Sequence, residues 1–296
     1  MSTLHGKTII ISGGSRGIGE AIAVRAARDG ANIALLAKTA EPHPKLPGTL
    51  YTAAKAIEDA GGQALPIVGD VRDDTSVEAA VARTAEQFGG IDIVLNNASA
   101  IDLTPTEAVS MKRYDLMQDV NARGSFLLSK LAIPYLKLSE NAHILTLSPP
   151  ISLDEKWFQA GHLAYSIAKY SMSLVTVGLA AELRQFGIAA NSLWPRTTID
   201  TAAIRNVVGA ELAAKSRTPE IMADAAHAIL TKPSREASGH FYIDDEVLAA
   251  EGVTDFSKYR IGEREEDLQL DFWVEARFPA EAPSDAVESR TPEPGP

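Results

Sequence analysis

The sequence predicts an α/β fold in which one parallel sheet is covered by helices on both faces. Three observations support this prediction. Short β-branched apolar segments alternate with longer helical patterns along the chain. A glycine-rich turn follows the first strand and opens the first helix. The alternation continues without an internal repeat or a second domain until residue 276. The expected architecture is therefore a single doubly wound sheet of the Rossmann type.

Composition and charge exclude several classes of protein. The chain has 296 residues and a formal net charge of -11, which argues against a nucleic-acid partner because the phosphate backbone requires a basic surface. The absence of cysteine excludes disulfides, thiolate zinc sites and a cysteine nucleophile. No metal site is expected, because the six histidines are scattered without ligand spacing. They are His5, His43, His143, His162, His227 and His240.

Neither end of the sequence shows a recognisable targeting signal. Residues 1–7 have no apolar core of signal-peptide length, and the last four residues are not a peroxisomal address. No apolar run approaches the roughly 20 residues that a membrane span needs. We therefore expect a cytoplasmic protein without a membrane span.

The first strand and the turn after it are the most informative local pattern. Residues 8–11 are β-branched, as expected for a strand buried on both faces of a parallel sheet. A helix is expected over residues 20–29, so the turn aims backbone N–H groups and the positive helix end at a phosphate. The glycines permit a tight turn and a close approach of the ligand. The turn contains Gly13, Ser15, Arg16, Gly17, Ile18 and Gly19.

The end of the second strand, residues 32–37, predicts which cofactor is bound. A dinucleotide fold that prefers NAD usually places an acid there to bind the ribose 2′-hydroxyl. Here the strand ends at Ala37 and is followed by Lys38, and Arg16 lies in the glycine turn. Two cations without an acid favour the 2′-phosphate of NADP(H) over NAD(H).

The remaining elements continue the alternation. A proline-rich loop at residues 41–48 has a role that the sequence leaves open. Asp74 is the expected N-cap of the helix that ends at Gln87. Further strands are expected at residues 64–68, 91–95, 143–147, 188–194 and 239–243, and further helices at residues 50–60, 114–138, 163–185 and 219–230.

Tyr165 and Lys169 are the strongest catalytic candidates. In a helix, a spacing of four residues places both side chains on one face. A nearby ammonium favours the phenolate, which lowers the tyrosine pKa from about 10 toward neutrality. Such a tyrosine can pass a proton to or from a substrate oxygen. A chance surface pair fits the spacing as well, and the surrounding motifs favour catalysis.

Taken together, these motifs resemble the short-chain dehydrogenase/reductase family between about residues 5 and 245. The shared features are the glycine turn, Asn96-Asn97-Ala98, Asn121 and the Tyr-x-x-x-Lys spacing, in this order. Residues 37–40, 42–46, 148–150 and 194–195 are similar to one subgroup, whose animal members carry a C-terminal sterol-carrier domain. Because of its length, we expect this chain to lack one. We expect one domain over residues 1–275 and a disordered, Pro/Glu-rich tail over residues 276–296.

The resemblance implies a set of cofactor contacts. The glycine turn would hold the pyrophosphate, Lys38 the 2′-phosphate, and Asp70 with Val71 the adenine. Asn97 and Ala98 would lie along the nicotinamide ribose. The residues after the strand at 188–194, namely Pro195, Thr197 and Thr198, would touch the nicotinamide carboxamide. The cofactor supplies the hydride, and the protein supplies position and electrostatics.

The resemblance also implies catalytic roles. Tyr165 would be the general acid in reduction and the general base in oxidation. Lys169 would hold the ribose hydroxyls and lower the tyrosine pKa, and Asn121 would hold a water in the proton relay. The serine that orients the substrate is either Ser148, at a strand end where site residues collect, or Ser152, by counting back from the tyrosine. We favour Ser148.

Two further residues depart from the family pattern. Ser99 replaces the glycine that usually follows Asn-Asn-Ala, which tightens the turn without removing function. Arg196 replaces the glycine that usually follows Pro195, and it is either a second phosphate contact or a solvated side chain.

The leading hypothesis is an NADP(H)-dependent oxidoreductase that interconverts a carbonyl and an alcohol. Residues 153–162 and the helix after Pro195 would roof the substrate pocket, and Trp157, Phe158 and Trp194 favour an apolar fatty-acyl, steroid or terpenoid substrate. These aromatics fit core or subunit contacts as well. The alternative is a protein that senses NADP(H) without turnover. A homodimer or homotetramer is expected, with the helices at 114–138 and 163–185 as interface elements.

Overall fold

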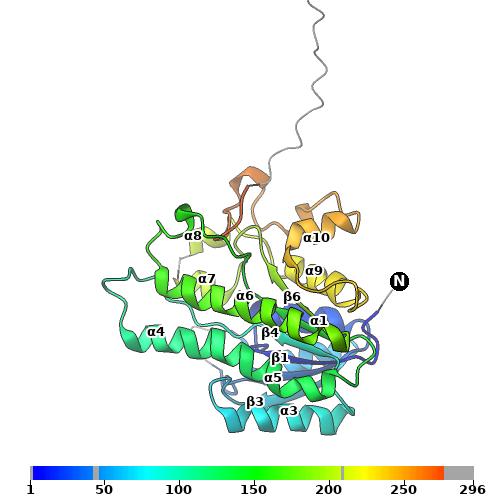
Figure 1. The fold of residues 1–296 in the computed structure, drawn as a ribbon. Helices are drawn as coiled ribbons and strands as arrows, with labels where there is room; N and C mark the ends of the chain where they lie inside the picture. Colours follow the sequence, from blue (N-terminus) through cyan, green and yellow to red (C-terminus); the bar gives the residue numbers. More distant parts are fainter. Residues whose placement is uncertain (1–2, 43–46, 208–209, 277–296) are drawn as a thin grey trace, which may run out of the picture.

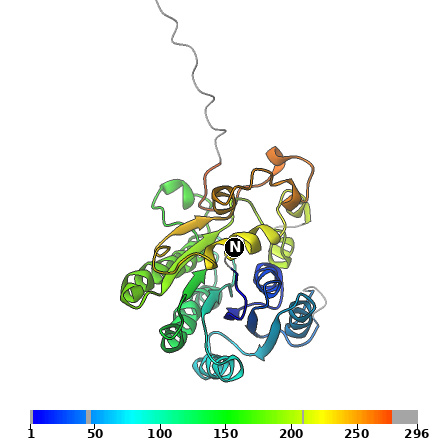
Figure 2. The same cartoon turned by 90° about the vertical axis from the view of Figure 1, so that its right-hand side faces the viewer.

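The computed structural model describes residues 3–42, 47–207 and 210–276, and it contains one seven-stranded, fully parallel sheet between two layers of helices (Figures 1 and 2). The strand order is β3-β2-β1-β4-β5-β6-β7. This is the predicted doubly wound α/β fold. The strands are β1 Thr8–Ser12, β2 Asn32–Ala37, β3 Gln63–Val68, β4 Ile93–Asn96, β5 His143–Thr146, β6 Ala189–Trp194 and β7 Phe241–Ile243.

The helices form two layers because the central strands are apolar on both faces. In β1, Ile9 and Ile11 belong to the core beneath α1, α2 and α9, whereas Ile10 belongs to the core beneath α3, α5 and α6. Successive side chains of a strand point to opposite faces, so one short strand supplies both cores. The helices are α1 Gly17–Ala27, α2 Leu50–Asp59, α3 Asp74–Phe88, α4 Met111–Met117, α5 Gly124–Leu136, α6 Leu163–Leu183, α7 Ala202–Val207, α8 Ala210–Ala213, α9 Glu220–Leu230 and α10 Asp244–Ala250.

The order of the strands reverses between β1 and β4, and this reversal creates a crevice. From β1 the chain continues through β2 to β3 on one side of the sheet, and then returns to β4 on the other side. In open α/β sheets, ligands bind outside the carboxyl ends of the strands at such a reversal. The glycine turn after β1 and Asn97 after β4 both lie at this point.

Two predicted helix starts were wrong by a short distance. The first helix begins at Gly17 and not at residue 20, so the last two glycines of the turn belong to its first turn. The N-cap of α3 is Asp73 and not Asp74, because the Asp73 carboxylate accepts a hydrogen bond of 2.8 Å from the N–H of Ser76. Element boundaries are decided by such local contacts.

The predicted continuous helix over residues 114–138 is interrupted. It consists of α4, a π-helical turn at Gln118–Arg123, and α5. The wider turn inserts an extra residue, and Ser125 donates a bond of 2.6 Å to the carbonyl of Asn121 within it. Such bulges are frequent at functional sites.

The chain after β7 returns to the carboxyl ends of the strands, which the sequence pattern did not predict. After α10, residues 268–276 run beside the segment that follows β6, and we call them the C-terminal strap. The predicted tail at residues 276–296 lies almost entirely outside the described residues.

Helix α6 and the turn after it, Leu163–Phe186, are long and apolar enough to cross a membrane by length and composition. This departs from the expectation that no apolar run approaches that length. In the fold, 56% of the apolar window is buried, so packing against the sheet accounts for its composition.

Candidate active site

A cavity of about 540 Å³ lies at the carboxyl ends of the strands and brings most of the predicted site residues together. It extends from the glycine turn to Tyr165 and Lys169 on α6. The predicted residues that line it are Gly13, Ser15, Arg16, Gly17, Ile18, Lys38, Asp70, Val71, Asn97, Ala98, Tyr165, Lys169 and Pro195.

The glycine turn is shaped by backbone geometry and by Asn97. Gly13 and Gly17 have φ values of +75° and +62°, which side chains other than glycine rarely adopt. The Asn97 side chain donates bonds of 2.9 Å to the carbonyls of both Ser12 and Gly13. A Cβ on Gly13 would lie 2.9 Å from the Cα of Ala98. Asn97 therefore holds the two loops of the crevice together.

At the end of the cavity where adenine is expected to bind, which we call the adenine end, a cation lies where the second strand stops. The Lys38 ammonium is 3.5 Å from the Asp70 carboxylate, and its side chain is 59% exposed. Asp70 also accepts several bonds from the Arg72 guanidinium, which is the main reason that the pKa of Asp70 falls to about 2. Arg16 donates to the carbonyls of Pro47 and Gly48 and lines the cavity.

Tyr165 and Lys169 lie on the buried face of α6, one turn apart, and both line the cavity. The Lys169 ammonium donates a bond of 2.7 Å to the carbonyl of Leu147 and lies 4.8 Å from the Trp194 ring. A helix that buries this face presents both polar groups to one chamber. The predicted spacing therefore brings the two side chains into one site.

The pKa of Tyr165 departs from the sequence prediction. Burial raises it above its ordinary value, the Asp271 carboxylate raises it further, and a side-chain hydrogen bond with Ser99 lowers it. Burial also lowers the pKa of Lys169 to about 7, and Asp271 opposes this change. The expected lowering by Lys169 is not found, because the ammonium is directed to the Leu147 carbonyl.

The other catalytic candidates, Asn121, Ser148 and Ser152, do not line the cavity. The Asn121 side chain accepts a bond from the N–H of Ala100 at 2.7 Å and donates one to its carbonyl at 3.0 Å. The Ser148 hydroxyl is fully buried without a hydrogen-bond partner among the described residues. The Ser152 hydroxyl instead accepts from the N–H of Asp154 within its own loop.

Several predicted residues do not line the cavity. The Thr198 hydroxyl lies 2.8 Å from that of Ser216, and Thr197 is buried beside the C-terminal strap. Gly19 lies against Asn97, and a Cβ there would be 2.6 Å from its amide nitrogen.

Arg196 is neither a phosphate contact nor a solvated side chain. It is 8% exposed and forms a buried ion pair of 2.9 Å with Asp245. It also pairs with Glu246 and donates to the carbonyl of Glu275. Arg196 therefore ties α10 and the strap to the end of β6.

Three residues of the site were missed. Ser99 lines the cavity together with Tyr165, and its side chain affects the Tyr165 pKa. Asp271 and Trp273 come from the strap, and the Trp273 ring lies 5.8 Å from Tyr165 and 5.6 Å from Trp194. Nothing in the local sequence around residue 271 points to a site, since only the return of the chain brings it there.

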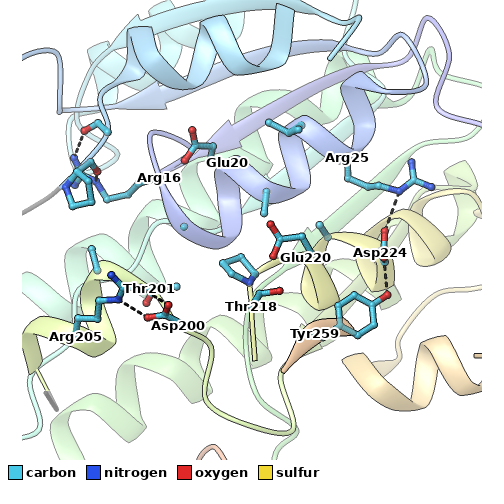
Figure 3. A pocket seen from close by; sticks show the side chains of 18 of the residues that line it. Arg16, Glu20, Arg25, Asp200, Thr201, Arg205, Thr218, Glu220, Asp224 and Tyr259 are labelled. Carbon is cyan, nitrogen blue, oxygen red and sulfur yellow. Dashed lines mark hydrogen bonds and ion pairs between the residues drawn. The ribbon is translucent and has the colours of Figure 1, made fainter. Parts of the chain in front are cut away.

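A larger cleft of about 1050 Å³ lies between α1 and α9 (Figure 3). Two of its labelled carboxylates are engaged by neighbouring side chains: Asp224 accepts from Arg25 and from the Tyr259 hydroxyl, and Asp200 pairs with Arg205. Within residues 3–42, 47–207 and 210–276, no group of three His, Asp or Glu side chains could hold a metal ion. The cleft adjoins the cavity, and both are lined by Arg16, Gly17, Thr201 and Ala202.

The cavity fits a dinucleotide. No side chain caps the N-terminus of α1, so its N–H groups remain available to a pyrophosphate, and the glycine turn leaves room beside them. Lys38 and Asp70 lie at one end, and the pair on α6 lies at the other. Fold and site together define a Rossmann-type dinucleotide-binding protein.

Comparison with known proteins narrows this class. The family model "short chain dehydrogenase" matches residues 7–211, and the chain therefore belongs to the short-chain dehydrogenase family of oxidoreductases. Members of this family bind a nicotinamide cofactor, NAD(H) or NADP(H), and act on small molecules.

The chain is also similar to individual relatives. It is 55% identical over 258 residues to hydroxysteroid dehydrogenase-like protein 2 of Xenopus laevis, covering 87% of this chain and 61% of that protein. The human protein of the same name is 51% identical, with 97% and 67% covered. A short chain dehydrogenase structure from Mycobacterium thermoresistibile is 56% identical, with a TM-score of 0.88 and 94% and 99% covered. The chain thus spans about three fifths of the Xenopus relative.

Proposed function

We propose that the protein is an NADP(H)-dependent oxidoreductase that interconverts a carbonyl and an alcohol, with Tyr165 as general acid and base. The observation that carries this proposal is the shared cavity. Tyr165 and Lys169 face the same chamber as the glycine turn, so a nicotinamide bound through that turn would reach the pair. Bound NADP(H) supplies or accepts the hydride.

The state of Tyr165 favours the direction of reduction. Its raised pKa keeps the hydroxyl protonated at neutral pH, and a protonated phenol can donate to the oxygen of a carbonyl as that oxygen becomes an alkoxide. Ser99 lines the same chamber, and its side chain opposes the rise of the Tyr165 pKa. Asn121 keeps the adjoining loop in place through both backbone groups of Ala100.

Two cations support NADP(H) as the cofactor. Lys38 lies at the end of β2, where an NAD-preferring site usually has an acid, and its exposed ammonium faces the cavity rim. Arg16 lines the same end of the cavity. A 2′-phosphate between these groups would gain two charge-assisted contacts.

The surroundings of Tyr165 support an apolar substrate of the fatty-acyl, steroid or terpenoid type. Tyr165, Trp194 and Trp273 belong to one apolar cluster, and Leu103 and Trp157 pack against it. Ligand pockets are lined mainly by such groups with a few polar atoms. We assign the substrate-orienting role to Ser148. Its buried hydroxyl has no partner among the described residues, and it follows Leu147, whose carbonyl binds Lys169.

The test is carbonyl reduction by the wild type and by Tyr165→Phe. Steady-state NADPH consumption is measured against a panel of apolar aldehydes and ketones. General acid catalysis is worth about 10²–10⁴-fold, so we expect kcat to fall by that factor while the NADPH Kd stays within about twofold. If NADPH binds and no panel member is turned over, the result favours the alternative, an NADP(H) sensor without turnover.

A further inference from the structure

The C-terminal strap is held against the active site by backbone hydrogen bonds. The N–H of Thr198 donates to the carbonyl of Gln269 at 2.9 Å, and the N–H of Asp271 donates to the carbonyl of Arg196 at 3.0 Å. The Trp194 indole N–H donates to the carbonyl of Phe272 at 2.9 Å. These bonds lock the strap to the segment that follows β6, and the strap lies beyond the residues that the family model matches.

The strap delivers one carboxylate to the catalytic end of the cavity. Asp271 lines the cavity together with Tyr165 and Lys169. Its own carboxylate accepts a bond of 2.7 Å from the N–H of Phe272, which fixes the orientation of the side chain. The other carboxylate among the lining residues is Asp70, which is engaged at the adenine end by Lys38 and Arg72.

The Lys169 ammonium lies in a buried and largely apolar environment. It is 3% exposed, and its ammonium contacts the Leu147 carbonyl, the Met172 sulfur at 3.7 Å and the Trp194 ring. Among the described residues, no carboxylate is in direct ion-pair contact with it, so a compensating charge has to act across the cavity that Lys169 lines. Burial of a lysine favours the neutral amine, and burial lowers the pKa of Lys169 to about 7. The carboxylate that opposes this change is Asp271.

We propose that Asp271 is the counter-ion of Lys169, a positioning residue that keeps the buried lysine charged and so preserves its role in carbonyl reduction. The proposal rests on the proposed function, because it assigns Lys169 a part in that reaction. A neutral amine would donate less strongly to ribose hydroxyls than the ammonium does.

The other polar groups around the pair do not take this role. Burial lowers the pKa of His162, whose ring centroid lies 6.4 Å from that of Tyr165, so this ring is neutral at neutral pH. Ser99 contributes an uncharged hydroxyl. Tyr170 donates its hydroxyl to the carbonyl of Ser152, and Arg196 is paired with Asp245.

Removal of the Asp271 charge should change the pH dependence of carbonyl reduction in one direction only. The carboxylate raises the pKa of both Lys169 and Tyr165, so its loss lowers both. Reduction needs the ammonium and the protonated phenol, and it fails as the pH rises through the lower of their pKa values. The alkaline limit of reduction should therefore move to lower pH. Below about pH 7, where Asp271 itself becomes protonated, the effect should vanish.

The experiment compares Asp271→Asn with the wild type and with Glu275→Gln. Glu275 is an exposed acid of the same strap that pairs with Lys156, so its variant is a matched control. The pH profile of kcat/KM for carbonyl reduction is measured from about pH 6 to about pH 10. A shift of about one pH unit, or roughly tenfold lower activity above the limit, is expected for Asp271→Asn alone. Equal profiles for all three proteins would overturn the proposal.

A second measurement does not depend on turnover. The chemical shift of the Lys169 Cε carbon in ¹³C-lysine-labelled protein reports the protonation of the amine, and the signal is assigned by its loss in Lys169→Arg. We expect the titration midpoint to fall by about one unit in Asp271→Asn, or in Asp271→Ser if the amide variant does not fold. An unchanged midpoint would refute the assignment of Asp271 as the counter-ion of Lys169. A lowered midpoint in a protein that reduces no carbonyl leaves the counter-ion intact and refutes the proposed function.

Discussion

The adenine end and the catalytic end of the cavity are built in different ways. At the adenine end, the glycine turn, Lys38 and Asp70 each follow the strand or loop that places them. At the catalytic end, Tyr165 and Lys169 share one helix, but Asp271 and Trp273 arrive from the far end of the described chain. At the first end, each residue stands just after its own strand, so the parallel sheet alone brings these residues together. The second also depends on the return of the strap.

Because of this difference, we expect cofactor binding and substrate chemistry to depend on different parts of the chain. The loops at the carboxyl ends of the strands are set by the sheet, so the cofactor site follows from the fold. The strap can change without disturbing the sheet, because it is attached through backbone bonds and an aromatic cluster. We expect changes in the strap to alter chemistry and stability, and changes in the glycine turn to alter cofactor binding.

Trp273→Ala should have the largest effect. The ring is 3% exposed and packs on Tyr165, Tyr170 and Trp194, and its backbone has a φ of +62°. Truncation of a buried tryptophan costs about 3–5 kcal/mol of the free energy of unfolding. Urea denaturation measures the loss. Trp157→Ala, at a partly exposed ring in the loop before α6, is the control and should cost less than half as much. Equal losses of unfolding free energy would show that the strap contributes no more to stability than the loop before α6.

Ser148→Ala should affect activity and stability in opposite directions. The hydroxyl is buried without a partner, so its removal should leave stability unchanged or raise it by up to about 1 kcal/mol. If Ser148 orients the substrate, kcat/KM should fall by about 10–100-fold. Ser152→Ala is the matched control, because it removes only a bond from the N–H of Asp154. A loss of activity confined to Ser152→Ala would show that Ser152, and not Ser148, orients the substrate.

Lys38→Asp should have the smallest effect of the three. It tests whether the adenine end of the cavity binds a 2′-phosphate. Loss of one cation from an exposed phosphate contact is worth about 1–2 kcal/mol, or roughly tenfold in the NADPH Kd. The NADH Kd should change by less than about threefold. Fluorescence titration of both cofactors checks this, with Lys55→Asp on the exposed face of α2 as the control. Equal losses for NADPH and NADH would contradict the 2′-phosphate assignment.

Much of the fold was predictable because its signals are local. The buried strands, such as Thr8–Ser12, are continuous apolar runs, and their positions were correct within about two residues. The break in the helix over residues 114–138 was not predictable. Within the π-helical turn the Asn121 side chain bonds Ala100 in a different segment, and that contact has no signature in the helix itself.

The sequence by itself determined the doubly wound sheet, the glycine turn and the pairing of Tyr165 with Lys169, because strand patterns and a spacing of four act over a few residues. Only the tertiary structure decided what surrounds that pair. It directs Lys169 to the Leu147 carbonyl, pairs Arg196 with Asp245, and brings Asp271 and Trp273 into the site. Burial and charges from distant segments set the protonation of the pair, and these depend on how the whole chain folds.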